Sequence, residues 1–426
     1  MTASIATSQT ILVVGAGISG MTAALEAAEC GREVVLVERS ATLGGRTALL
    51  YRYFPKMCHP TCGLEINLRR LKSNPRVRVL TMAEVVSIEG SRGSYTATLK
   101  LRPRYVNEKC TACGDCAAAV STEIPNPYNY GLGQIKAAHL PYAMAYPQRY
   151  VLDPSLIGTA DAERALTACK VGAIDLAMQE QTVELAVGAV VWATGWKPYD
   201  AAKIQPYGYG RFPNVITSLE FERLADPGGP TGGKLLRPSD GKEAKNIAFI
   251  QCAGSRDENH LRHCSRICCM ASLKQTQYVR EAHGEAAKST IYYIDIRAID
   301  RFEDFYQMVQ RDATVTFVKS KVARIAQDPN GDPVLHGVDT EGYHRYATPH
   351  DLVVLAIGME PEANGITLPD DVITDSSGFI EGSADGGMLG AGSAASPLDV
   401  NRSVQSATGA ALRAIKVIYQ TAKEEA

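Results

Sequence analysis

The sequence predicts an α/β protein with two dinucleotide-binding folds, and three observations support this prediction. Four short apolar runs, each with the length of a buried strand, lie far apart along the chain: residues 11–14, 189–192, 246–251 and 352–356. The first run leads into a glycine-rich turn, and the second and fourth also end in turns that contain glycine. Because these turns lie on both sides of the third run, we expect the chain to leave one domain, build a second and re-enter the first.

The first glycine-rich turn has the pattern of a dinucleotide-binding loop. Gly15, Gly17 and Gly20 form G-x-G-x-x-G after a strand. A helix is predicted from Met21 to Cys30, and the next strand ends at Glu38. In such a unit the glycines let the backbone approach a pyrophosphate at the helix N-terminus, and the acid binds ribose hydroxyls. A glycine-rich helix start without a ligand is the alternative. The candidate cofactor-binding residues are Gly15, Gly17, Ile18, Ser19, Gly20, Glu38 and Arg39.

Two further glycine turns extend this site. Leu43-Gly44-Gly45-Arg46 resembles the second FAD loop of two-domain flavoproteins of the thioredoxin reductase type, and Ala193-Thr194-Gly195 resembles their first crossing between domains. The pairing of these turns with the first loop favours FAD over NAD. The added candidates are Gly44, Gly45, Arg46, Ala193, Thr194 and Gly195.

A third FAD element is predicted between Met388 and Leu412. In the same flavoproteins a Gly-Asp pair binds the ribityl chain, and here the pair is Gly392-Ser393, which puts that contact in doubt. The Ala-rich helix that follows would direct its N-terminal amides at the negative charge of a reduced flavin, and a capped surface helix is the alternative. The candidates are Gly392, Ser393, Ser403, Val404 and Gln405.

Composition and charge exclude several classes of protein. The 426 residues hold 44 basic and 46 acidic side chains without a long run of either sign, so we expect neither nucleic acid nor anionic lipid as a partner. The first ten residues lack the features of a secretory signal, and the longest apolar stretches are too short for a membrane span. We therefore expect a cytoplasmic protein.

The eleven cysteines indicate metal or redox chemistry rather than disulfides, since their number is odd and the expected compartment is reducing. A cysteine replaces the phosphate-binding turn that a nicotinamide-binding enzyme would place after the 246–251 strand. Cys252, Cys264, Cys268 and Cys269 follow in the pattern C-x11-C-x3-C-C. Four thiolates suit zinc or a [4Fe-4S] cluster, and the adjacent pair argues against the usual C-x2-C zinc knuckle. An iron-sulfur cluster is the preferred interpretation.

At these residues the chain resembles the HdrA family, the flavin-containing subunits of heterodisulfide reductases. The resemblance rests on Cys-Ala-Gly-Ser-Arg at 252–256, on Cys-Ser-Arg-Ile-Cys-Cys-Met-Ala-Ser-Leu-Lys-Gln at 264–275, and on Tyr-Tyr-Ile-Asp-Ile-Arg at 292–297. It implies that the four cysteines hold a cluster beside the flavin. Lys274 becomes a candidate catalytic residue that stabilises the reduced flavin, and a solvent-facing lysine is the alternative. Shortened forms of this family act in sulfur-oxidising organisms.

A second cysteine set lies in an inserted segment. Cys110, Cys113 and Cys116, with the remote Cys169, have the arrangement of one cluster of a two-cluster ferredoxin. Val120 stands where the fourth close cysteine is expected, so the segment is interpreted as a degenerate ferredoxin-like insertion. Retention of one cluster and a remnant with free thiols both stay open.

The predicted domains follow from these assignments. The FAD domain comprises 1–105, 178–240 and 346–426, the ferredoxin-like insertion is 106–177, and a second Rossmann-like domain with the iron-sulfur site is 241–345. Cys58 and Cys62 invite comparison with the redox-active pair of dithiol-disulfide flavoenzymes, but their spacing does not match, and a role near the cluster or flavin and simple packing are the alternatives.

The predicted function is electron transfer between FAD and a [4Fe-4S] cluster within a heterodisulfide reductase-like complex in cytoplasmic sulfur oxidation. The resemblance implies other subunits of such a complex and a lipoate-bearing carrier protein as partners, and analogy with two-domain flavoproteins implies a homodimer. Two alternatives are a free-standing NAD(P)H-dependent flavin disulfide oxidoreductase and a non-catalytic scaffold that keeps FAD for structure.

Overall fold

The structure, a computed structural model, describes residues 6–362 and 368–424, which form two compact units. The first unit comprises residues 1–48, 61–196 and 361–426, and the second comprises 49–60 and 197–360. The chain passes between them at β12 (Trp196–Pro198) and β21 (Met359–Pro361). Each unit is built around a parallel sheet.

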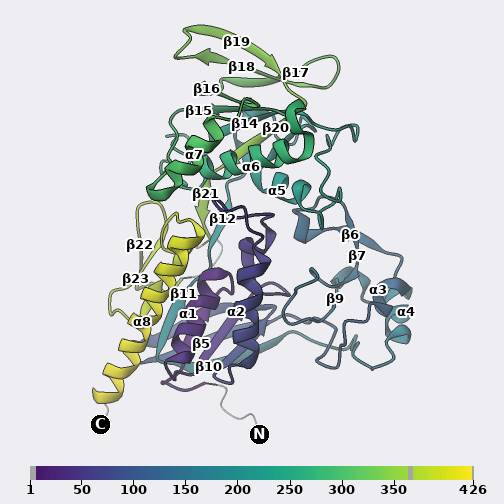
Figure 1. Ribbon diagram of the computed structural model, residues 1–426. Helices are drawn as coiled ribbons and strands as arrows, with labels where there is room; N and C mark the ends of the chain where they lie inside the picture. The colour runs from purple at the N-terminus through teal and green to yellow at the C-terminus, as the bar shows by residue number, and fades with distance from the viewer. Residues whose placement is uncertain (1–5, 363–367, 425–426) are drawn as a thin grey trace. The chain divides into compact units, whose positions relative to one another are not determined.

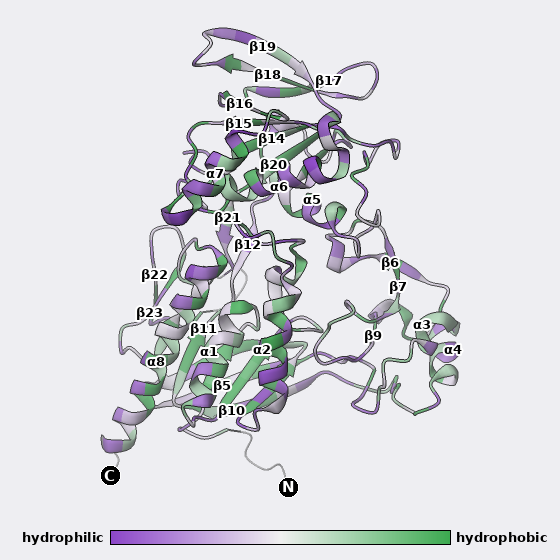
Figure 2. Ribbon diagram, in the orientation of Figure 1, coloured by the Kyte–Doolittle hydropathy of each residue, from purple (hydrophilic) through white to green (hydrophobic). Residues whose placement is uncertain are grey.

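The first unit is a three-layer α/β structure (Figure 1). Its seven-stranded sheet has the order β22-β23-β24-β11-β1-β2-β3 and is parallel from β24 to β3. The strands are β1 (Ile11–Val14), β2 (Val34–Glu38), β3 (Val77–Thr81), β11 (Ala189–Trp192), β22 (Val372–Thr374), β23 (Ile380–Ser383) and β24 (Met388–Gly390). The central strands are apolar along their whole length because both faces of the sheet are covered, and they are mainly green in Figure 2.

Helices cover one face of this sheet and a second sheet covers the other. One core cluster joins Ile11 and Val13 to the helices α1 (Ile18–Glu29), α2 (Thr61–Ser73) and α8 (Val400–Glu424). The other joins Leu12 and Val14 to the antiparallel sheet β10-β5-β4. That sheet consists of β4 (Ala83–Ser91), β5 (Ser94–Leu101) and β10 (Gln181–Val187). Alternate residues of β1 thus point into different cores, as the period of a strand requires.

The inserted segment forms a small lobe of the first unit with its own core. Val106, Val120, Leu152 and Ile174 are buried in that core together with Cys116. The lobe contains α3 (Asp115–Ala119), β6 (Glu123–Pro125), β7 (Gln134–Lys136), β8 (Ala138–His139), β9 (Val151–Leu152) and α4 (Ala160–Ala168). Its ferredoxin-like character stays a prediction.

The second unit has a five-stranded parallel sheet in the order β13-β20-β14-β15-β16. These strands are β13 (Val215–Thr217), β14 (Asn246–Ala253), β15 (Lys288–Tyr293), β16 (Val315–Lys319) and β20 (Leu352–Ile357). Its helices are α5 (Ser218–Ala225), α6 (Cys268–His283) and α7 (Glu303–Gln310). A separate antiparallel sheet joins β17 (Arg324–Gln327), β18 (Pro333–Asp339) and β19 (His344–Pro349).

The observed units differ from the predicted domains at three segments. Residues 49–60, 197–240 and 346–360, which the sequence assigned to the FAD domain, cluster with the second unit. For the last two segments the reason is that β13 and β20 are neighbours in the second sheet, where β20 also pairs with β14. The glycine turn after residue 357 therefore belongs to the second fold and leads directly into β21, where the chain returns to the first unit.

A buried histidine gives the second unit a predicted pH dependence. His350 places Nδ1 3.0 Å from Oδ1 of Asn246 and Nε2 3.0 Å from the Tyr292 hydroxyl. Burial lowers the pKa of His350 to about 4, with Asp351 opposing. Since the unfolded value is about 6.5, the unfolded chain binds the proton first, and up to about 3 kcal/mol of stability should be lost as the pH falls from 6.5 through 4.

Urea unfolding at several pH values, compared between wild type and His350→Gln, isolates this contribution from that of the carboxylates. We expect the free energy of unfolding of His350→Gln to fall less steeply over this pH range, while His344→Gln, at an exposed position, follows wild type. Parallel curves for wild type and His350→Gln would show that His350 does not contribute.

Candidate functional site: two glycine loops and two cysteine sets

The first glycine loop is packed so closely that only glycine fits at two positions. Gly15 has a φ of +96°, and a Cβ atom there would lie 2.4 Å from the carbonyl oxygen of Ala193. A Cβ atom on Gly20 would lie 1.7 Å from the carbonyl oxygen of Gly15. The end of β1 thus touches both α1 and β11 through bare backbone. Helix α1 begins with Ile18, Ser19 and Gly20. Its N-cap residue, Gly17, has no side chain to bond the amides of the first turn.

Glu38 fixes the conformation of this loop from the end of β2. Its carboxylate accepts hydrogen bonds from the amides of Ala16 and Ser40, both at 2.8 Å, and its side chain is buried. Because a carboxylate oxygen has two lone pairs, these bonds leave acceptor capacity for ribose hydroxyls. The acid predicted from the sequence therefore lies at the loop, where it also orients the loop.

The second glycine turn lies against the first. Gly44 and Gly17 form an isolated bridge, and Gly44 has a φ of +116°. Arg46 follows in a 3-10 helix, donates from Nε to the carbonyl oxygen of Trp196 at 2.5 Å and covers the indole ring. The two turns predicted as FAD loops are thus brought together within the first unit.

Glu362 is a site residue that the sequence analysis missed. Its carboxylate lies 2.8 Å from Nη1 of Arg39 and 3.8 Å from Nη2 of Arg46. Arg39 and Arg46 are both predicted cofactor-binding residues, so their orientation depends on an acid more than 300 positions away in the chain. No local motif marks Glu362, because its role arises only from the return of the chain at β21.

An unsatisfied hydroxyl marks the Ala193-Thr194-Gly195 turn. Among the described residues, Oγ1 of Thr194 is buried and has no hydrogen-bond partner. A buried hydroxyl without a partner costs free energy, and such atoms often face a ligand or water. Together with the close-packed glycines, this donor fits the polar groups of a dinucleotide cofactor.

The third predicted element approaches the first glycine helix. Gly392 has a φ of +61°, and a Cβ atom there would lie 1.9 Å from Oγ of Ser19. Ser393 replaces the usual Asp, and its Oγ atom lies 3.3 Å from Oγ of Ser403. Gly392, Ser393 and Ser403 therefore lie together with the opening of α1. Val404 and Gln405 follow in the first turns of α8.

The amides at the start of α8 are partly engaged by a cap. Asp399 accepts a hydrogen bond from the amide of Arg402 at 3.0 Å through Oδ1, and the Ser403 amide bonds to its carbonyl oxygen. The cap is therefore observed, and a role of the α8 amides at the flavin stays a prediction.

The second unit brings its four cysteines to the end of β14 and the start of α6. Cys252 lies at the strand end with a φ of +55°, which is unusual for a residue other than glycine. Cys268 and Cys269 are the first residues of α6, are 8% and 6% exposed, and lie at the positive end of its macrodipole. Cys264 precedes them in the connecting loop and is partly buried.

The four thiols affect one another's pKa values. Burial raises the pKa of Cys268 well above its ordinary value, and the thiols of Cys252, Cys269 and Cys264 add to the rise. Burial also raises the pKa of Cys269, to about 11. Thiols with such pKa values become thiolates only when a nearby cation compensates their charge.

The surroundings of the four thiols supply hydrogen-bond donors. The amide of Arg266 donates to Sγ of Cys264 at 3.3 Å, and Nη1 of Arg256 lies 3.9 Å from Sγ of Cys252. Gln251 accepts from the Cys269 thiol through Oε1, while its buried Nε2 has no partner among the described residues. Donors aimed at sulfur are a regular feature of iron-sulfur sites, so the chemistry of these thiols and donors suits such a cluster.

Within residues 6–362 and 368–424, no group of three or more His, Cys, Asp or Glu side chains is arranged so that it could hold a metal ion as it stands.

Lys274 is neither solvent-facing nor free. It is 2% exposed, and its ammonium lies 2.8 Å from Oε1 of Glu222 and 2.7 Å from the carbonyl oxygen of Arg52. Glu222 also accepts from Gln275 and the Tyr278 hydroxyl. The solvent-facing alternative for Lys274 is wrong, because a buried carboxylate holds its ammonium. A role at the flavin stays a prediction.

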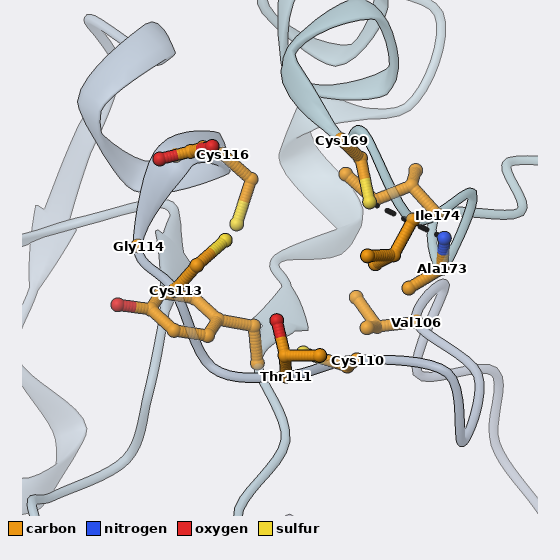
Figure 3. Close-up of a pocket in the computed structure, with 12 residues that line it drawn as sticks. Val106, Cys110, Thr111, Cys113, Gly114, Cys116, Cys169, Ala173 and Ile174 are labelled. Atoms are coloured by element: carbon orange, nitrogen blue, oxygen red, sulfur yellow. Dashed lines mark hydrogen bonds between the residues drawn. The ribbon is translucent and has the colours of Figure 1, made fainter.

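The inserted lobe brings its four cysteines around one pocket (Figure 3). The other lining side chains are mostly apolar, with Val106, Ala173 and Ile174 among them. Two of the sulfur atoms accept hydrogen bonds from backbone amides: Cys110 from Ala112 at 3.4 Å and Cys169 from Ala173 at 3.2 Å. The cysteines are Cys110, Cys113, Cys116 and Cys169. The remote Cys169, which caps the end of α4, is thus folded against the close trio, and Val120 is a core residue of the lobe.

Cys58 and Cys62 are both exposed, and Cys62 lies in the first turn of α2. The Cys58 thiol makes a long contact of 3.8 Å to the carbonyl oxygen of Lys56. None of the described contacts gives this pair the environment of a catalytic dithiol.

Comparisons with known proteins show which families this chain resembles. Residues 10–60 match the family of FAD dependent oxidoreductases. The chain is 40% identical over 358 residues to the iron-sulfur A subunit of the CoB–CoM heterodisulfide reductase of Methanocaldococcus jannaschii, covering 82% of this chain and 53% of the relative. It is 36% identical over 419 residues to the second form of this iron-sulfur A subunit in Methanopyrus kandleri, covering 95% of this chain and 63% of the relative.

The resemblance to the HdrA family, the A subunits of heterodisulfide reductases, is confirmed. A third relative, the A subunit of a ferredoxin/F420H2-dependent heterodisulfide reductase of Methanosarcina acetivorans, is 38% identical, and the match covers 83% of this chain and 45% of the relative. The chain therefore spans between about half and 63% of the length of these three relatives.

Solved structures confirm the fold class. The thioredoxin reductase of T. acidophilum matches with a TM-score of 0.54 and 13% identity, covering 97% of this chain and 99% of the other. The enzyme of Lactococcus lactis matches with a TM-score of 0.53 and 14% identity, covering 98% and 99%. In the described part of the chain, no helix combines the length and apolar character that a membrane span requires.

Proposed function

We propose that this chain is the flavin and iron-sulfur electron-transfer subunit of a heterodisulfide reductase-like complex. The observation that carries the proposal is the convergence of Cys252, Cys264, Cys268 and Cys269 at the end of β14. A nicotinamide-binding domain would have its phosphate loop after that strand. Thiols at this position favour an iron-sulfur cluster over a second dinucleotide.

FAD is assigned to the glycine loops of the first unit. Gly15, Gly17 and Gly20 admit the pyrophosphate, Glu38 binds the ribose, and Thr194 supplies a buried hydroxyl to the cofactor. Glu362 holds Arg39 and Arg46 in place beside the loops. When bound, FAD exchanges electrons in pairs and a [4Fe-4S] cluster exchanges them singly, which gives the chain the means to connect the two kinds of carrier.

The protein's own contribution at the iron-sulfur site is to orient and desolvate the thiolates. Cys268 and Cys269 are held by α6, whose N-terminus favours negative charge. Arg256 is fixed by a bidentate ion pair with Asp295, with N–O distances of 2.5 and 3.0 Å, and presents a donor to Cys252. These contacts stabilise the anionic ligand set and limit access of water to it.

We assign a second [4Fe-4S] cluster to Cys110, Cys113, Cys116 and Cys169. The pocket that these cysteines line, with sulfur atoms bonded to backbone amides, supports retention of one cluster by the insertion. The proposal also includes a cytoplasmic homodimer that acts in sulfur oxidation with other heterodisulfide reductase-like subunits and a lipoate-bearing carrier protein. The subunit names of the relatives support the complex.

Anaerobic reconstitution of the full chain tests this function. We expect stoichiometric FAD and about eight iron atoms per chain, as two [4Fe-4S] clusters require. Reduction of the flavin by an electron donor other than dithionite should produce an EPR signal from a reduced cluster. A preparation with FAD that is rapidly reduced by NADH or NADPH and contains no iron would favour a flavin disulfide oxidoreductase instead.

A further inference from the structure

A buried cation without an anionic partner lies next to the cysteine pocket of the insertion. Arg104 is 6% exposed and follows β5 at the entry to the inserted lobe. Its guanidinium donates only to neutral acceptors: the carbonyl oxygens of Arg149, Tyr150 and Ala41 and the hydroxyl of Thr81. Among the described residues, no carboxylate lies within ion-pair distance of Arg104.

A buried charge of this kind is costly. Transfer of an ion out of water is repaid only when an opposite charge and hydrogen bonds compensate it. Arg104 has the hydrogen bonds but not the opposite charge. Burial lowers its pKa to about 10, and the nearby Arg149 adds to this effect, while the thiol of Cys110 opposes it. A thiolate at Cys110 would therefore favour the charged form of Arg104.

Arg104 is connected to the pocket by hydrogen bonds to the backbone of segments near or in its lining. Val106, two residues further along the chain, lines the pocket, and so does Tyr150. The guanidinium bonds the carbonyl oxygens of Arg149 and Tyr150 at 3.1 and 3.5 Å. The amide of Leu152 in turn bonds the carbonyl oxygen of Arg104 at 3.3 Å. Arg104 therefore cannot move away from the pocket without breaking its hydrogen bonds to residues 149–152, a segment from which Tyr150 lines the pocket.

We propose that Arg104 is the buried counter-charge of the [4Fe-4S] cluster held by Cys110, Cys113, Cys116 and Cys169, and that it raises the reduction potential of this cluster. The inference rests on the second cluster of the proposed function. Four thiolates give the cluster site a net negative charge, and reduction adds one more. A fixed cation stabilises the reduced form more than the oxidised form, and net charge and burial are among the factors that set such potentials.

Three variants of the full chain separate charge from structure. Arg104→Gln removes the cation. Thr81→Asp keeps the guanidinium and places a carboxylate beside it, since the present Thr81 hydroxyl lies 3.0 Å from Nη2 of Arg104. Thr81→Val is the matched control, because it removes the same hydrogen bond without adding charge. A further variant, Arg104→Lys, keeps the positive charge and should retain most of the effect.

The measurement is an EPR-monitored redox titration of the reconstituted full chain, in which the signal that disappears in Cys110→Ser identifies this cluster. We expect its midpoint potential to become more negative in Arg104→Gln and in Thr81→Asp and to stay near wild type in Thr81→Val and Arg104→Lys. Iron content is measured for every variant.

Two outcomes would overturn the inference and are distinguishable. If Arg104→Gln and Thr81→Asp retain full iron and titrate like wild type, the second cluster exists but Arg104 does not tune it. If Cys110→Ser has the iron content of wild type, the second cluster itself is absent and the counter-charge role falls with it. Should Arg104→Gln fail to fold, Thr81→Asp decides alone, since it leaves the hydrogen bonds of Arg104 to residues 149–152 intact.

Discussion

Gly15→Ala is expected to reduce the FAD content of the purified chain from stoichiometric to near zero. The new Cβ atom would lie 2.4 Å from the carbonyl oxygen of Ala193, and the φ of +96° is strained for any residue with a side chain. The left-handed conformation costs about 1–2 kcal/mol, and overpacking costs about 1–3 kcal/mol more. The loop must therefore shift, and the close approach of backbone to pyrophosphate is lost.

Gly31→Ala is the matched control for this prediction. Gly31 also has a positive φ, +85°, but a Cβ atom there would meet nothing within 4 Å. We expect it to lose only about 1–2 kcal/mol of stability and to keep its FAD. FAD absorbance per chain and thermal unfolding measure both effects. If Gly15→Ala bound FAD as well as Gly31→Ala, the assignment of the first loop to the cofactor would be wrong.

Cys268→Ser is expected to remove one cluster, about four iron atoms per chain, while FAD stays bound. Cys268 is the first residue of α6 and is buried, and the other three thiols of its set contribute to the rise of its pKa. A serine hydroxyl is a much poorer ligand for iron than a thiolate. The flavin loops are built from segments of the first unit, to which Cys268 does not belong.

Cys30→Ser serves as the control, because Cys30 is exposed beyond the end of α1 and belongs to neither set. Its iron content should match wild type. Iron analysis and EPR of the reduced protein check both variants. Wild-type iron in Cys268→Ser would remove Cys268 from the ligand set.

The sequence was sufficient to predict the elements whose chemistry is local. The glycine turns, the acid at the end of β2 and the grouping of cysteines all follow from short patterns, because close backbone approach and thiol clustering each restrict residue type. Helix α1 begins at Ile18, three residues before its predicted start, since Ser19 and Gly20 already have helical conformation. The order of the two folds was also predicted.

Features that depend on distant parts of the chain could not be predicted. Glu362 reaches Arg39, and Glu222 reaches Lys274, only because the fold returns those segments to the same place. Neither acid lies in a motif. The glycine turns marked both crossings, but the domain bounds were placed elsewhere for a similar reason, since a strand gives no sign in its own sequence of which sheet it joins. Arg104 is likewise an ordinary arginine until its burial is known.

The central claim is that thiols of the second unit hold a cluster that exchanges electrons with the flavin of the first unit. Stepwise anaerobic reduction of the reconstituted full chain, followed in parallel by flavin absorbance and by EPR, tests it most directly. We predict that an EPR signal absent from Cys268→Ser grows as the flavin is reduced and decays as the flavin is reoxidised. A flavin that cycles fully while this signal stays unchanged, or a site that contains zinc instead of iron, would contradict it.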